Sequence, residues 1–86
     1  MKTLYILNNP SLYAQCTKAM SDTDSLLLIE DAVALSLQET VKQHYVLEED
    51  LVARGLLASY DRSWELADYP IFVDLSLAFD KTVTWL

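Results

Sequence analysis

The sequence predicts an α/β domain in which a small parallel sheet lies between helices. Two short runs, at residues 3–7 and 25–29, consist almost entirely of aliphatic and aromatic side chains. Apolar runs of this length are typical of strands that are covered on both faces. Helix-like segments follow both runs, and alternating strands and helices favour a parallel sheet. We therefore expect one three-layer domain spanning residues 1–86.

The run at 25–29 predicts a strand that ends in an acidic turn. Glu30 and Asp31 follow it directly, and a segment of small and apolar residues comes next. Carboxylates are favoured where a helix begins, because the first N–H groups lack internal partners and the helix dipole is positive there. This pattern predicts a strand over 25–29 and a helix over 32–39.

The same pattern occurs a second time further along the chain. A strand is expected at 43–47, and Glu48, Glu49 and Asp50 follow it before a short helix that reaches Arg54. Gly55 is the only glycine in the chain. It fits a helix C-cap, where the backbone often has positive φ.

The remaining elements follow from turn residues and helical spacing. A first helix begins at Pro10 or Ser11, since proline is tolerated in the first turn. Its expected apolar face consists of Leu12, Tyr13, Cys16, Ala19 and Met20. We further expect a short strand at 63–66, a helix at 71–79 after a cap region at Asp68, and a terminal strand at 82–86.

The helix at 71–79 carries apolar side chains on two sides. One face holds Ile71, Phe72, Leu75 and Phe79. Val73 and Leu77 point to the other side, which indicates a second burial surface and makes them candidate interface residues. The alternative is that they are scattered exposed aliphatic side chains, which are common on protein surfaces.

Composition indicates a protein partner rather than a nucleic acid. Of the 86 residues, 52% are apolar or aromatic and 22% are charged. A chain of this size buries only about 60–65% of its unfolded surface, so surplus apolar side chains suit a partner surface. The net charge is −7 and no basic cluster offsets it. Phosphate backbones repel such a chain, which argues against direct nucleic-acid binding.

Location is predicted from the single cysteine and from the N-terminal residues. One cysteine allows no internal disulfide, which fits a reducing compartment. The apolar start is interrupted at Asn8, Asn9 and Pro10. It is too short for a signal-peptide core or a membrane span, so we expect a cytoplasmic protein with no membrane association.

Cys16 is the one candidate nucleophile of the thiol class. A sulfur-carrying cysteine needs partial exposure and a lowered pKa, supplied by a helix N-terminus or a nearby cation. Cys16 instead lies mid-helix on the apolar face, and Lys18 points elsewhere. The local sequence therefore favours a buried and inert Cys16.

Other polar candidates are weak. Glu30 and Asp31 could form an acid–base pair at the ends of parallel strands, but helix capping explains them better because no nucleophile accompanies them. His44 is the only histidine, and a lone histidine is poor evidence for a metal site. There is no glycine-rich phosphate loop and no hydrolase motif. We expect no cofactor and no metal.

Four blocks of the sequence resemble the DsrH/TusB family in order and spacing. They are residues 27–33, 45–56 and 68–75 and the ending 84–86. The resemblance implies a DsrEFH-like α/β fold and a subunit of a cytosolic sulfur-relay complex. The implied partners are TusC/DsrF-like and TusD/DsrE-like subunits in a heterohexamer. Chain and family differ at Ala32, where members often have glycine, and by a shortened segment between Glu39 and Gln43.

The resemblance implies two functional alternatives. In a TusBCD-type complex, which relays sulfur that ends as the 2-thio group of wobble uridine in tRNA, the B subunit is mainly structural and the D subunit holds the essential cysteine. In a DsrH-type subunit of a sulfur-oxidation complex, Cys16 would carry a persulfide, because some members have a cysteine in the first helix. An unrelated interaction module with flavodoxin-like topology is the third hypothesis.

Overall fold

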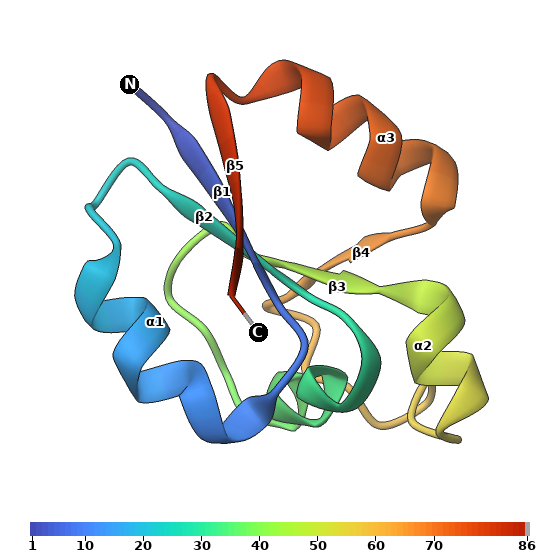
Figure 1. The fold of residues 1–86 in the computed structure, drawn as a ribbon. Coiled ribbons are helices and arrows are strands. Elements are labelled where there is room, and N and C mark those ends of the chain that lie inside the picture. Colours follow the sequence, from blue (N-terminus) through green and yellow to red (C-terminus); the bar gives the residue numbers. More distant parts are fainter. Residues whose placement is uncertain (86) are drawn as a thin grey trace.

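The structure is a five-stranded parallel sheet with helices on both faces (Figure 1). It is a computed structural model that describes residues 1–85. The strands are β1 (Thr3–Leu7), β2 (Ser25–Leu28), β3 (Tyr45–Leu47), β4 (Glu65–Ala67) and β5 (Lys81–Trp85). Their spatial order is β4-β3-β2-β1-β5. This order differs from the 2-1-3-4-5 order of flavodoxin-like domains, so the hypothesis of a module with flavodoxin-like topology is wrong.

One face of the sheet is covered by the helices of the first two-thirds of the chain. They are η1 (Pro10–Leu12), α1 (Tyr13–Ala19), η2 (Glu30–Leu37) and α2 (Glu48–Ala53), where η denotes a 3₁₀ helix. Leu7, Leu26, Leu28 and Val46 from the strands form the core here with side chains of these helices. These residues alternate with residues of the opposite face, as the two-residue period of a strand requires.

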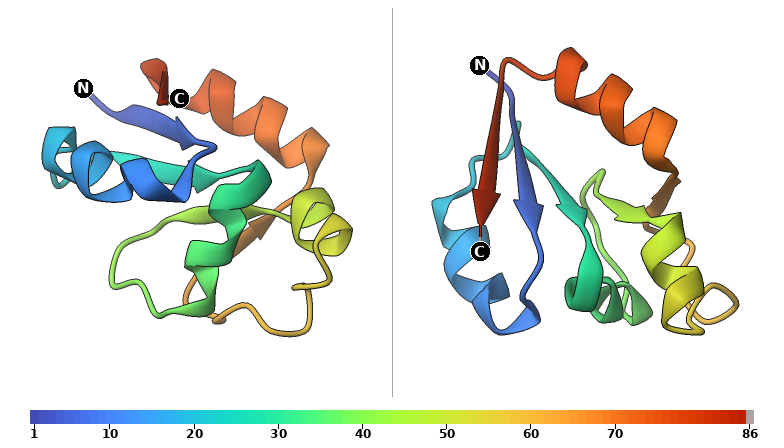
Figure 2. Two further views of the ribbon diagram at one scale, coloured as in Figure 1. Left: turned by 60° about the horizontal axis from the view of Figure 1, so that its bottom comes forward. Right: turned by 45° about the vertical axis from the view of Figure 1, so that its right-hand side comes forward.

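In the described part of the chain, the other face is covered by a single helix, α3 (Tyr69–Ala78), which connects β4 to β5 across the sheet (Figure 2). Phe72, Leu75 and Phe79 pack against a second core cluster of Leu4, Ile6, Leu27, Tyr45 and Ala67. The predicted three-layer α/β architecture is therefore confirmed, with an unequal number of helices on its two sides.

The second predicted helix is a 3₁₀ helix rather than an α-helix. It covers Glu30–Leu37 instead of 32–39. The N–H of Ala32 donates to Ile29 O at 3.0 Å, an i→i−3 bond. The Ser36 hydroxyl also competes with backbone N–H groups for a carbonyl acceptor, because it donates to Val33 O at 2.6 Å. Tight bonding of this kind gives 3.0 residues per turn, which suits a short connection between β2 and β3.

Several element boundaries differ from the prediction. His44 precedes β3 instead of lying within it, and β4 begins at Glu65 rather than at residue 63. Ser63 N–H donates to Asp61 Oδ1, and Trp64 N–H to Asp61 O, so residues 61–64 form a turn. Helix α3 begins at Tyr69, two residues before the predicted start, and directly follows the expected cap residue Asp68. Leu86, predicted to belong to the last strand, lies outside the described residues.

The Gly55 cap is confirmed by its backbone. Gly55 has φ +68°, and the following residue, Leu56, donates its N–H to Leu51 O at 2.8 Å. This is the bond pattern that ends α-helices at a glycine in the left-handed conformation. The helix α2 therefore stops where the sequence predicts.

Candidate functional site

Cys16 is completely buried. It lies in α1, facing the sheet, and belongs to the core cluster that contains Leu7, Leu26 and Val33. Burial raises the pKa of the Cys16 thiol above its ordinary value, because a thiolate is disfavoured away from water. The predicted apolar environment of this residue is confirmed, although Ala19, assigned to the same face, is exposed. In this conformation the thiol presents no surface to a sulfur donor.

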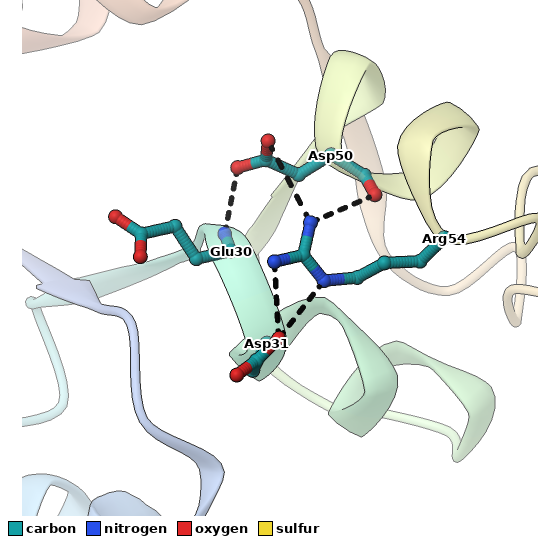
Figure 3. Close-up of polar contacts among 4 residues, drawn as sticks. All are labelled: Glu30, Asp31, Asp50 and Arg54. Atoms are coloured by element: carbon teal, nitrogen blue, oxygen red, sulfur yellow. Dashed lines mark hydrogen bonds and ion pairs between the residues drawn. The ribbon is translucent and has the colours of Figure 1, made fainter.

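The acidic strand ends form a polar cluster that links two neighbouring chain segments (Figure 3). Arg54 donates from Nε and Nη2 to Asp31 Oδ1 at 3.1 and 3.0 Å. The backbone N–H of Glu30 donates to Asp50 Oδ2 at 2.6 Å. Arg54 Nη1 lies 3.9 Å from Asp50 Oδ1. Asp31 and Asp50 are thus engaged with a cation and with backbone, which is a structural use of these carboxylates.

Glu30 has an unusual backbone conformation at this position. Its φ is +51°, and it is the one non-glycine residue among residues 1–85 with positive φ. The left-handed region costs an ordinary L-residue roughly 1–2 kcal/mol. The short bond from its N–H to Asp50 compensates for part of that cost. The chain therefore turns sharply between β2 and η2.

His44 is a buried hydrogen-bond acceptor. Its Nδ1 accepts the Leu26 N–H at 3.1 Å, so the ring proton is on Nε2. The ring lies 5.9 Å from the Trp64 ring, measured between centroids. Burial lowers the pKa of His44, and the neutral ring satisfies a strand N–H. A pocket of about 300 Å³ adjoins this histidine, with Tyr13, Asp24 and Lys42 also in its wall.

The outward side of α3 is apolar. Tyr69, Val73 and Leu77 are 52%, 58% and 79% exposed. They are spaced four residues apart, so they form one stripe along the helix, which we call the outer ridge. Ile71, assigned to the inward face with Phe72, is 42% exposed. Sequence reasoning identified two members of the ridge but omitted Tyr69, which the four-residue spacing could have found.

Within residues 1–85, no three His, Cys, Asp or Glu side chains are grouped so that they could hold a metal ion. None of the helices in the described part of the chain has the length and apolar character needed to cross a membrane.

These features define the chain as a small α/β protein with a buried thiol and an apolar outer helix face. The family model described as DsrH like protein matches residues 9–82. Protein TusB from Yersinia pestis (strain Pestoides F) is 37% identical over 71 residues, covering 72% of this chain and 75% of the relative. Protein TusB from Yersinia pseudotuberculosis serotype O:1b (strain IP 31758) gives the same values. The chain belongs to the DsrH-like family, as its sequence blocks predict.

Proposed function

We propose that this protein is the B-type subunit of a cytoplasmic sulfur-relay complex of the TusBCD type. In that role it holds TusC-like and TusD-like subunits in their assembled geometry and contributes to 2-thiolation of wobble uridine in tRNA without contacting the RNA. The observation that carries the proposal is the exposed outer ridge of α3. A family member with a fully buried thiol and an uncovered apolar helix face is suited to assembly.

The buried state of Cys16 supports a structural role over a carrier role. A persulfide carrier must bring its thiolate to the outer sulfur of a donor persulfide, and Cys16 has no accessible surface. Its raised pKa further reduces the thiolate fraction near neutral pH. The sulfur-carrying thiol would then belong to another subunit.

Co-expression tests the assembly. The chain is produced together with C-type and D-type subunits from the same organism, and the mass of the purified complex is determined by native mass spectrometry. We expect one species that contains two copies of each of the three chains. Recovery of the C-type and D-type subunits as a complex that never includes this chain would refute the proposal.

The alternative is a DsrH-type subunit of a sulfur-oxidation complex in which Cys16 carries sulfur. Its position in the first helix favours this second function. The Cys16 thiolate would attack the outer sulfur of the donor persulfide, forming a new S–S bond while the donor S–S bond breaks and the donor leaves as a thiol. This reaction would add about 32 Da to the chain. An adduct on the wild-type chain, absent from Cys16→Ser, would support this alternative.

A further inference from the structure

We propose that the outer ridge of α3 seats in an apolar groove of a different polypeptide chain whose rim is lined by Lys and Arg side chains. The inference rests on the proposed function, because the partner would be a sister subunit of the assembly. It adds the chemistry of the contact and names the residues of this chain that make it.

The ridge is not explained by the folding of this chain. The opposite side of α3 already covers the sheet through Phe72, Leu75 and Phe79. Tyr69, Val73 and Leu77 point away from that core and are more than half exposed. Figure 2 shows α3 alone on its side of the sheet, with no other helix or strand of residues 1–85 over it. Its outward surface is therefore free for a second molecule.

The shape of the ridge suits a groove. Residues spaced four apart form the rows of side chains that pack into the grooves of another helical surface. From Tyr69 to Leu77 the row is about 12 Å long, at 1.5 Å per residue. A helix that lays one apolar stripe into a groove is a common recognition mode.

The charge around the ridge specifies the rim of the partner. Residues 68–80, which contain α3, carry Asp68, Asp74 and Asp80 and no Lys or Arg. Asp74 is exposed and lies between Val73 and Leu77 in the sequence. Complementary charge at an interface attracts the correct partner and repels others. A basic rim is complementary, whereas a second copy of this acidic chain, a nucleic acid or an anionic lipid is repelled.

The first turns of α2 and α3 are joined by one hydrogen bond, although the two helices cover opposite faces of the sheet. Glu49 Oε2 accepts the Tyr69 N–H at 3.2 Å, which joins the two helices. The partner groove would therefore contact the ridge over its length, with the Tyr69 end of the ridge next to the first turn of α2.

Substitution of the ridge tests the apolar contact. The affinity of this chain for the C-type and D-type subunits is measured for wild type and for Leu77→Asp. We expect a loss of about tenfold or more, because a buried carboxylate replaces an apolar contact. Val41→Asp is the matched control, since Val41 is 91% exposed and lies in a different part of the chain. It should bind as wild type does.

Charge reversal tests the rim. Asp74→Lys should weaken binding and reduce its dependence on salt, since one attractive pair becomes repulsive. Asp22→Lys is the matched control, because the Asp22 side chain is 99% exposed and is remote in sequence from α3. Circular dichroism of each isolated variant establishes that the chain remains folded.

The outcomes separate the two proposals. If wild type joins the assembly and both Leu77→Asp and Asp74→Lys bind as tightly as wild type, the proposed docking surface is wrong while the proposed function stands. If wild type does not bind the C-type and D-type subunits, the proposed function fails and this inference with it. If the isolated chain forms a homodimer that Leu77→Asp dissociates, the occupant is a second copy and the inference is overturned.

Discussion

Arg54 and Asp31 form a two-bond ion pair that joins the end of α2 to the beginning of η2. Two of the three donor nitrogens of Arg54, Nε and Nη2, reach the same oxygen, Asp31 Oδ1. The two residues are 23 positions apart and follow neighbouring strands, β2 and β3. The pair therefore connects the two helices that follow these strands (Figure 3).

Removal of this pair should have a small effect on stability. The Arg54 side chain is 32% exposed and that of Asp31 is 80% exposed, so solvent screens their attraction. We expect Arg54→Met to lower the free energy of unfolding by at most about 1 kcal/mol, measured by urea denaturation. Lys42→Met, which removes the exposed pair with Asp22, is the control and should change stability less. A loss of several kcal/mol for Arg54→Met would contradict this assignment.

Backbone strain at Glu30 predicts a gain in stability from glycine. Glu30→Gly relieves the left-handed conformation at φ +51°. Glycine also raises the conformational entropy of the unfolded chain, which opposes this gain. We therefore expect a net stabilisation of about 0–1 kcal/mol.

Gly55→Ala supplies the opposite comparison. Gly55 has φ +68°, and a Cβ there would meet no atom within 4 Å. Any loss of stability therefore comes from the backbone alone, and we expect about 1 kcal/mol. If both substitutions change the urea midpoint in the same direction, the account of strain at Glu30 is incorrect.

Burial of Cys16 predicts slow modification by thiol reagents. In the folded chain the thiol has no accessible surface, so reaction requires local or global opening. We expect the modification rate to rise steeply with urea as the unfolded population grows, and Cys16→Ala to cost about 1–2 kcal/mol through the small cavity it leaves. Complete modification of the folded chain within seconds would show that the helix opens readily.

His44 predicts a loss of stability on acidification. Burial lowers the pKa of His44 below its ordinary value of 6.5; the charge of Lys42 acts in the same direction, and a hydrogen bond with the Gln43 backbone opposes them. The contribution of the neutral His44 ring to the free energy of unfolding is therefore complete above pH 6.5. It is lost as the pH falls through the lower pKa of the folded state. Protonation would also remove the acceptor of the Leu26 N–H.

Thermal melts from about pH 7 to about pH 5 check this effect. His44→Gln should give a flatter profile, since it removes the titrating ring. The carboxyls of Asp24 and Asp61 do not interfere, because hydrogen bonds hold their pKa values below 3.8. Equal pH dependence of wild type and His44→Gln would contradict the role assigned to His44.

The parallel sheet was predictable because its central strands are apolar on both faces. Leu26, Leu27 and Leu28 are all fully buried, which is what an uninterrupted aliphatic run indicates. The Asp68 cap was also predictable, and its carboxylate accepts the Ile71 N–H at 2.9 Å. These signals are local, so they can be recognised without knowledge of tertiary contacts.

The features that depend on distant contacts were not predictable. Trp64 was expected in a strand, but its indole donates to Gln38 O at 2.7 Å and its ring fills the core. The acceptor role of His44 and the ion pair of Arg54 likewise depend on residues far apart in the sequence. The candidate interface could be outlined from helical spacing alone, whereas the hydrogen bond that joins α3 to α2 depends on residues 20 positions apart.

We propose that this chain supports sulfur transfer by assembly and does not carry sulfur itself. The most direct measurement is the rate of sulfur transfer in a reconstituted complex that contains Cys16→Ala, compared with wild type and with a preparation that lacks this chain. We predict that Cys16→Ala transfers sulfur at the wild-type rate and that omission of the chain abolishes transfer. Loss of transfer in an intact complex with Cys16→Ala would contradict the account.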